Sequence, residues 1–292
     1  MTMVARFLCL TAGLLLGSLL NSSNAVAQND SPTPENVASA KPSQSPEAAL
    51  KRFVAECVTI TPGEGKFSRK FSIGSRKLAK YELPIQETAI AMDFRISKYE
   101  TTQELYQAVM GANPSRWKGL RNSVENIRYA DAERFCLKLT ALLRSKDLIR
   151  KNDIVRLPTY IEWEYCCRSG TDTRYSFGDD AGTNSATEIL DTYAWHTGNA
   201  AGNDPAVGIL KPNQWGLYDM HGYLSEFVSE GPLSLTKEAD EKCLIRGGSW
   251  KDEHPRLSSS AYFTIPADFR DDAVGFRCVI AEKPLAKKQA AK

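Results

Sequence analysis

The chain has 292 residues, of which 42% are hydrophobic and 25% are charged, values that are ordinary for a soluble globular protein. Its 37 basic and 35 acidic side chains leave a formal net charge of only +2. Because so small a charge produces no field that would attract a polyanion, we expect no nucleic-acid partner.

Residues 1–27 have the pattern of a secretory signal peptide. Arg6 precedes an apolar run from Phe7 to Leu20, and Ala25-Val26-Ala27 is a small-residue cleavage site before Gln28. The run is short for a transmembrane helix, and a retained membrane anchor is the alternative. We therefore expect a secreted or periplasmic protein with no transmembrane span after signal cleavage.

Composition divides the remainder into three parts. Residues 28–50 are rich in Ser, Pro, Ala and Asn, which predicts a disordered linker because such a segment has little apolar surface to bury. Residues 51–282 are long enough for one domain with a proper core. Residues 283–292 form a basic tail that is expected to be solvated.

Short patterns in the first third of the domain predict strands. Alternating or β-branched residues mark 54–61, 70–73 and 90–97, and Pro62-Gly63 provides a turn after the first.

Three helices are predicted next in chain order. Thr101-Thr102 caps the first, Gly111 ends it, and the second covers Tyr129 to Leu143. Thr159 begins the third, and Glu162 three residues later completes a capping box. The second half of the domain is punctuated by Gly, Asn, Asp and Pro, which is typical of loops. Together these patterns predict a loop-rich α+β fold in a single domain.

Cysteine usage depends on export. Six cysteines follow the predicted cleavage site: Cys57, Cys136, Cys166, Cys167, Cys243 and Cys278. In an oxidising compartment some of them are expected to form disulfides. The chain has no C-x-x-C motif, so a thioredoxin-like site or a zinc ribbon has no support. Cys136 lies on the apolar face of a predicted helix, where a buried free thiol is the alternative.

Several separated motifs agree with one family. They are KYETTQ at 98–103, VMGANPS at 109–115, RLPT at 156–159, EWEY at 162–165, PNQWGLYDMHG at 212–222, RGGSW at 246–250 and GFR at 275–277. In this order the set resembles the sulfatase-modifying-factor family, whose founding members are formylglycine-generating enzymes. The resemblance covers Phe53 to Ile280 and implies a loop-rich variant of the C-type-lectin fold.

The resemblance also implies what chemistry to look for. Formylglycine-generating members oxidise a sulfatase cysteine with copper(I), a soft ion held by two cysteine thiolates that follow the Gly-Gly-Ser motif. The two corresponding positions here are Asp252 and Leu257, neither of which offers a thiolate. We therefore expect neither copper binding nor the founding reaction.

Two further features follow from the resemblance. Calcium is bound by many members, and Glu226 in the segment 222–227 is a candidate ligand. Asn199 and Asp204, in the loop after Trp195, are candidates for another site, with solvated loop residues as the alternative. Cys167 and Cys278 occupy positions that resemble a structural disulfide of the enzymes.

The stretch between RGGSW and GFRC decides the functional interpretation. We expect it to form the ligand-binding surface of a binding module. The expected ligand is an exported protein, such as a sulfatase, or a peptide or a glycan. The candidate contacts are Ser249, Trp250, Asp252, His254, Arg256 and Arg270. The other tryptophans are expected in the core. The alternatives are an oxidoreductase with an unrecognised site and a structural part of an extracytoplasmic complex.

Overall fold

The computed structural model of the chain describes residues 45–76, 81–179, 188–200, 204–230 and 241–283. The predicted signal peptide, most of the predicted linker and nearly all of the basic tail lie outside these ranges. The described residues belong to one unit, residues 40–292. No helix among them is long and apolar enough to cross a membrane.

The secondary structure is a mixture of short helices and short strands. The helices are α1 (Pro46–Ala55), α2 (Gln103–Met110), α3 (Tyr129–Ser145), α4 (Tyr160–Arg168) and α5 (Glu188–Asp191), with a 3₁₀ helix, η2, at His254–Leu257. The strands are β1 (Cys57–Ile60), β2 (Lys70–Ile73), β3 (Gln86–Ala89), β4 (Phe94–Ser97), β5 (Asp153–Arg156), β6 (Ser225–Val228), β7 (Lys242–Arg246), β8 (Tyr262–Pro266), β9 (Val274–Gly275) and β10 (Val279–Glu282).

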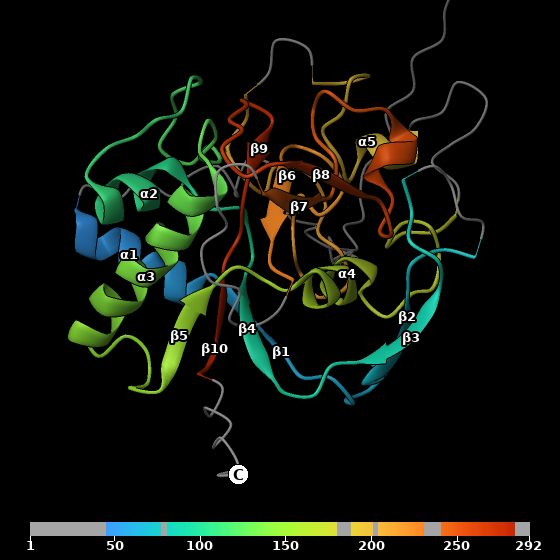
Figure 1. Cartoon of the computed structure of the whole chain (residues 1–292), viewed down its shortest axis with the longest axis horizontal. Helices are drawn as coiled ribbons and strands as arrows, with labels where there is room; N and C mark the ends of the chain where they lie inside the picture. Colours follow the sequence, from blue (N-terminus) through green and yellow to red (C-terminus); the bar gives the residue numbers. More distant parts are fainter. Residues whose placement is uncertain (1–44, 77–80, 180–187, 201–203, 231–240, 284–292) are drawn as a thin grey trace, which may run out of the picture. The chain divides into compact units, whose positions relative to one another are not determined.

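The strands form two four-stranded sheets and one two-stranded sheet. The first sheet has the order β1-β4-β10-β5, and all its pairs are antiparallel. The second has the order β8-β7-β6-β9, in which only the β6–β9 pair is parallel. The last strand, β10, therefore lies between β4 and β5 near the middle of the first sheet, as Figure 1 shows.

Two hydrophobic cores cover opposite faces of strand β10. Cys278 and Ile280 pack with the apolar faces of α1, α2 and α3, whereas Val279 packs with Trp163 of α4. This division follows from the alternation of side chains along a strand. Figure 1 shows α1, α2 and α3 grouped beside the first sheet, and α4 toward β6 and β7.

Local sequence signals predicted the three central helices correctly. Thr102 is the N-cap of α2, and Gly111 ends it with a left-handed φ of 83°, a conformation that glycine adopts without steric cost. Thr159 and Glu162 form the predicted capping box of α4. The predicted α+β single-domain fold is confirmed.

The predicted linker is wrong at its C-terminal end, because residues 46–50 begin helix α1. Ser45 caps this helix by accepting a hydrogen bond from the backbone N–H of Ala48, and Pro46 occupies its first turn. Leu50 and Phe53 are buried on one face. The Ser- and Pro-rich composition concealed a helix start, and Val54, predicted to begin a strand, is helical as well.

The predicted disulfide between Cys167 and Cys278 is absent, and all six described cysteines are free thiols. Cys167 lies in the core on the α4 side, and its sulfur is 3.6 Å from the carbonyl oxygen of Met220. Cys278 lies in the opposite core, where its sulfur is 3.8 Å from that of Cys136. The sheet therefore separates the two residues of the predicted pair.

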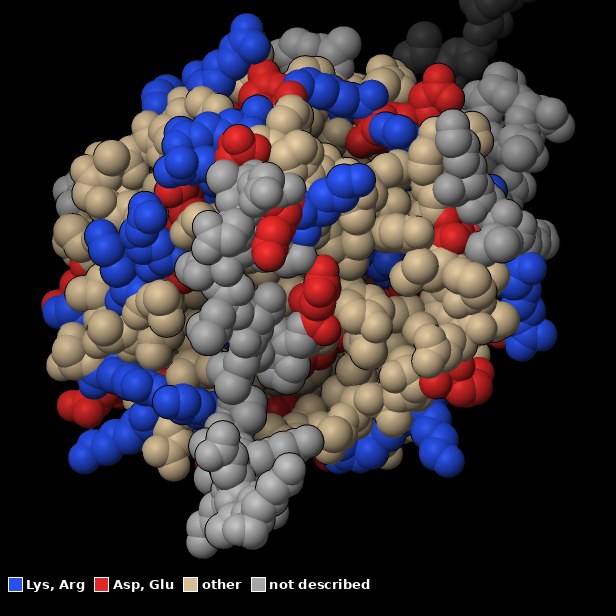
Figure 2. Space-filling view, in the orientation of Figure 1, with Lys and Arg blue, Asp and Glu red and all other residues tan. Residues whose placement is uncertain are grey.

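Charged side chains of both signs are interspersed over the face shown in Figure 2. This agrees with the almost balanced composition of the chain.

Candidate functional site

The segment after β7 is fixed at its start by a double-glycine turn. Gly247 and Gly248 have φ values of 90° and 69°, and a Cβ atom at Gly248 would lie 2.8 Å from the carbonyl oxygen of Arg256. The loop therefore folds back against its own start. Arg246, the last residue of β7, is fully buried, where it pairs with Glu164 and donates to the carbonyl oxygen of Ser259 over 3.0 Å.

The two positions that hold copper-binding cysteines in the enzymes have structural contacts here. Asp252 accepts hydrogen bonds from the backbone N–H of Ser249 over 2.9 Å and from its hydroxyl over 2.7 Å. The other carboxylate oxygen of Asp252 is 2.8 Å from the guanidinium of Arg256. Leu257 is fully buried in a small apolar cluster that includes Tyr175. Both side chains thus stabilise the loop.

An aromatic cavity of about 120 Å³ opens beside this loop. Its aromatic walls come from four separate segments and are Trp117, Trp195, Tyr223 and Trp250. The indole N–H of Trp250 donates to the backbone carbonyl of Asp272 over 3.2 Å, and that of Trp117 donates to the Asp272 carboxylate over 3.2 Å. Asp272 therefore fixes the orientation of two of the four rings.

Three carboxylates also line the cavity: Glu125, Asp204 and Asp272. Asp272 is paired with Arg116 and Lys251, so its charge is compensated. Asp204 accepts hydrogen bonds from the neutral side chains of Asn122 and Tyr223.

Glu125 is the least satisfied group in the cavity. Its side chain is only 2% exposed, and one oxygen accepts the backbone N–H of Trp117 over 3.0 Å. The other oxygen, Oε2, has no hydrogen-bond partner among the described residues. Burial raises the pKa of Glu125 to about 6. The indole N–H of Trp195 likewise has no partner among these residues. Such orphaned buried groups are uncommon and require an explanation.

The six residues predicted as ligand contacts do not converge on this cavity, because only Trp250 lines it. Ser249 is buried and bonded to Asp252. The backbone carbonyl of His254 accepts the hydroxyl of Tyr175, and its side chain is exposed. Two arginines lie elsewhere: Arg256 packs over the rings of Tyr81 and Phe263, and Arg270 is 3.6 Å from Asp131.

Glu226 and Asn199, both predicted as calcium ligands, are engaged by protein groups. The carboxylate of Glu226 accepts hydrogen bonds from two nitrogens of the buried Arg277, over 2.7–2.9 Å, and from the indole N–H of Trp163, over 2.8 Å. The side-chain amide of Asn199 accepts the backbone N–H of His196 and donates to the carbonyl of Ala194. Within the described ranges no group of three or more His, Cys, Asp or Glu side chains is arranged to hold a metal.

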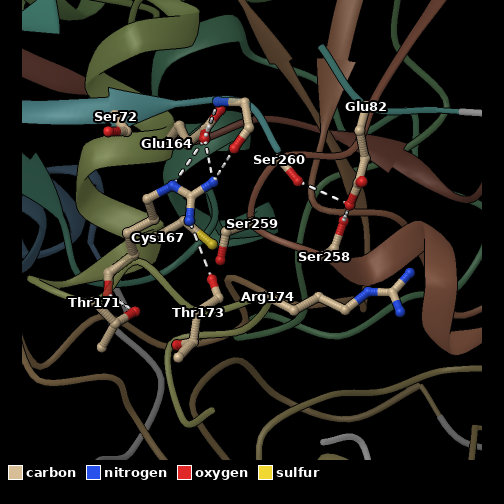
Figure 3. A network of polar contacts seen from close by, with 12 residues as sticks. Ser72, Glu82, Glu164, Cys167, Thr171, Thr173, Arg174, Ser258, Ser259 and Ser260 are labelled. Atoms are coloured by element: carbon tan, nitrogen blue, oxygen red, sulfur yellow. Dashed lines mark hydrogen bonds and ion pairs between the residues drawn. The ribbon is translucent and has the colours of Figure 1, made fainter. Parts of the chain in front are cut away.

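A second, polar cavity of about 480 Å³ lies near the end of β2 and the end of α4. Two of its charged groups are held by the protein: Glu82 accepts the hydroxyls of Ser258 and Ser260, and Arg168 bonds Glu164 and the carbonyl of Thr173, the network drawn in Figure 3.

A thiol and an imidazole meet next to this network. The sulfur of Cys167 is 3.7 Å from Nε2 of His221. Burial raises the pKa of Cys167 to about 12 and lowers the pKa of His221 to about 4. Both groups are therefore neutral at pH 7, which makes Cys167 a poor nucleophile.

Sequence reasoning missed most of the cavity. Trp117 was expected in the core but is 42% exposed, and Tyr223 was not among the predicted ligand contacts. Of the tryptophans expected in the core, Trp163 is fully buried. The sequence did contain one signal for the cavity, namely the Trp, Tyr and acidic residues within or next to the family motifs. Loop geometry brings these residues together, and loops have no periodic pattern from which their geometry could be predicted.

The fold and the site define a single-domain α+β protein with a rigid double-glycine loop beside an aromatic cavity. The chain belongs to the sulfatase-modifying-factor family. Its residues 42–282 match the family described as "Sulfatase-modifying factor enzyme 1-like domain". This confirms the family that the motifs indicated.

Relatives and solved structures agree with this assignment. The chain is 29% identical to the chaperone protein LppX of Paenibacillus barcinonensis, over 54% of this chain and 69% of that protein. Treponema denticola variable protein 1 has a TM-score of 0.61 and 25% identity, over 76% of this chain and 94% of that one. PvdO from Pseudomonas aeruginosa has a TM-score of 0.61 and 23% identity, over 77% and 93%, and shares the fold.

Proposed function

We propose that this protein is a binding module that holds a peptide segment of an exported partner protein in the aromatic cavity beside Trp250. The observation that carries this proposal is the cavity itself, in which three indoles and one phenol surround a buried carboxylate with an unmet oxygen. Concave apolar sites with a few polar groups are typical of ligand binding, and Trp and Tyr are the usual anchors of recognition surfaces.

Two observations favour binding over the oxidation that the founding members perform. Asp252 is bonded to Ser249 and Arg256, and Leu257 is packed in an apolar cluster, so neither supplies a soft ligand for copper(I). A relative named a chaperone protein also supports a protein partner.

We further propose export. The first 27 residues have the pattern of a secretory signal peptide.

Export would expose the cysteines to an oxidising compartment. There the Cys136 and Cys278 thiols, whose sulfurs are 3.8 Å apart, would pass two electrons and two protons to an oxidant such as oxidised glutathione and form a disulfide. We expect exported protein to begin at Gln28 and to yield a non-reduced peptide pair containing Cys136 and Cys278 in mass spectrometry. A Cys167–Cys278 pair, or uncleaved protein, would contradict this.

The binding function predicts a large effect at Trp250. Peptides selected from a random display library on the full chain are expected to lose about 30-fold in affinity for Trp250→Ala, the scale of a hot-spot residue. Phe269→Ala, at an exposed aromatic residue that does not line the cavity, is the matched control and should bind normally. Equal binding by both variants would contradict the proposal.

The oxidase alternative is tested in the same preparation. The full chain is supplied with copper(I), oxygen and a cysteine-containing sulfatase peptide, and the peptide mass is followed. We expect no formylglycine in the peptide, although copper and oxygen alone can join two peptide thiols in a disulfide, as a control without the protein will show. Conversion of the cysteine to formylglycine would establish the oxidoreductase instead.

A further inference from the structure

Three observations define the chemistry that the aromatic cavity accepts. The first is its wall: the faces of Trp and Tyr rings carry negative potential and attract cations. Rings of this cavity already contact basic side chains, because the guanidinium of Arg116 lies 4.8 Å from the ring centre of Trp117 and the ammonium of Lys251 lies 5.0 Å from that of Trp250.

The second observation is the charge balance around the cavity. Lys251 is held by Asp271 and Asp272, and Arg116 by Asp272, so these two cations are already paired. Glu125 and Asp204 have no ion-pair partner among the described residues. Among the described residues that line the cavity there is no Lys, Arg or His side chain to balance Glu125 and Asp204.

The third observation is the position of the unmet group. Oε2 of Glu125 is buried in a cavity wall and has no hydrogen-bond partner of normal geometry among the described residues, although the nearby backbone N–H of Arg116 also lowers the pKa of this carboxyl. An incompletely satisfied buried carboxylate is costly unless a ligand or a proton satisfies it. A cation in the cavity would satisfy this oxygen and contact the rings at the same time. A volume of about 120 Å³ suits a compact head group and not a whole folded element.

We propose that the cavity recognises an ammonium group at the end of a short aliphatic chain, the class that includes lysine side chains and free methylated amines. This inference rests on the proposed binding function and specifies its ligand. The indoles of Trp117, Trp195 and Trp250 surround the alkyl part and the methyl groups, and Glu125 supplies the opposite charge. The alkyl carbons also gain from burial against apolar walls.

The test uses a pair of ligands that differ only in charge. Choline and its neutral isostere 3,3-dimethylbutan-1-ol are titrated into the full chain, with calorimetry and tryptophan fluorescence as readouts. We expect choline to bind about ten-fold more tightly than the isostere. Equal affinity for the two compounds would overturn the inference.

A variant and its control assign the effect to the carboxylate. Glu125→Gln retains an oxygen for the backbone N–H of Trp117 but removes the charge, so we expect about ten-fold weaker choline binding. Glu253→Gln, at an exposed acidic residue outside the cavity, should bind as the wild type does. Denaturant unfolding of Glu125→Gln establishes that the variant is folded. A folded Glu125→Gln chain with unchanged choline affinity would contradict the assignment.

Acidification provides an independent readout. Because burial raises the pKa of Glu125 to about 6, choline binding should weaken as the pH falls from 7.5 to 5. The charged groups that face Glu125 are Asp204 and Asp272, and Asp272 is compensated by Arg116 and Lys251. Binding that strengthens on acidification would contradict the role of Glu125.

Two further arms distinguish the source of the ammonium group. Nα-acetyl-lysine methylamide is compared with its side-chain-trimethylated and side-chain-acetylated forms, and selected peptides are compared with their lysine-to-norleucine versions. Tighter binding of lysine peptides indicates a protein source, and tighter binding of free choline indicates a metabolite. If peptides bind through Trp250 without any dependence on ammonium, the ligand class is wrong while the binding function stands. If neither peptides nor cations bind, the proposed function itself fails.

Discussion

Replacing Arg277 with Met is expected to destabilise the protein by roughly 3–5 kcal/mol, the cost of leaving a buried carboxylate without its partner. Arg277 is fully buried, and its guanidinium bonds Glu226 and the backbone carbonyl of Tyr218. It bonds Glu226 of β6 in the second sheet and the backbone carbonyl of Ser97 of β4 in the first, so it connects the two sheets. Glu100 and Asp219 are close enough to depend on the same positive charge.

Denaturant unfolding at pH 7 measures this effect. Arg277→Lys keeps the positive charge but loses the planar guanidinium group with its paired N–H donors, so an intermediate loss of stability is expected. The double variant Arg277→Met with Glu226→Gln should recover part of the stability, because it removes the unpaired charge as well. Lys51→Met breaks an exposed ion pair with Glu47 and should change stability by less than about 1 kcal/mol. A similarly small effect for Arg277→Met would show that the buried network does not contribute.

The second large effect is a pH dependence of stability between about pH 4 and 6.5, where buried groups act in opposite directions. Burial raises the pKa of Asp219 to about 6 and that of Glu100 well above its usual range. The folded state therefore binds these protons more tightly than the unfolded state, and stability is lost as the pH rises through the folded-state values.

His221 acts in the opposite direction. Burial lowers its pKa to about 4, so the unfolded state binds the proton more tightly and stability is lost as the pH falls below about 6.5. Between about pH 4 and 6 the contributions of Asp219 and His221 therefore oppose each other. The Asp219 contribution is on the order of 3 kcal/mol, because one pKa unit corresponds to about 1.4 kcal/mol.

Asp219→Asn removes the contribution of Asp219 and leaves that of His221. Asn tolerates the left-handed φ of 58° at this position and retains an acceptor for the backbone N–H of Gly208. Urea unfolding between pH 4 and 6.5 should show stability rising more steeply with pH for this variant than for the wild type, because the opposing contribution of Asp219 is removed. Asp93→Asn, at an exposed side chain, is the control and should keep the wild-type slope. Equal slopes for Asp219→Asn and the wild type between pH 4 and 6.5 would contradict the role of Asp219.

Local sequence signals predicted the helices because each depends on neighbouring residues. The Thr159–Glu162 box and the Gly111 cap needed no knowledge of the rest of the fold. The start of α1 at Pro46 was missed because its Leu50 and Phe53 face is short and follows a polar, proline-rich segment.

Long-range pairings were beyond such signals. The position of Cys278 opposite Cys136 follows from the register of β10, which pairs with β4 and β5 far away in the sequence. Similarly, Glu226 was interpreted as a metal ligand because nothing in the sequence places Arg277 against it. The cavity around Trp250 was anticipated at one residue only, since Trp117 and Trp195 reach it from separate loops.

The central claim is that the cavity beside Trp250 is the ligand site. A crystal structure of the full chain grown with choline tests it most directly. The account predicts a trimethylammonium group between the rings of Trp195 and Trp250, next to Oε2 of Glu125. Choline ordered at another place in a crystal whose aromatic cavity holds only water would contradict it.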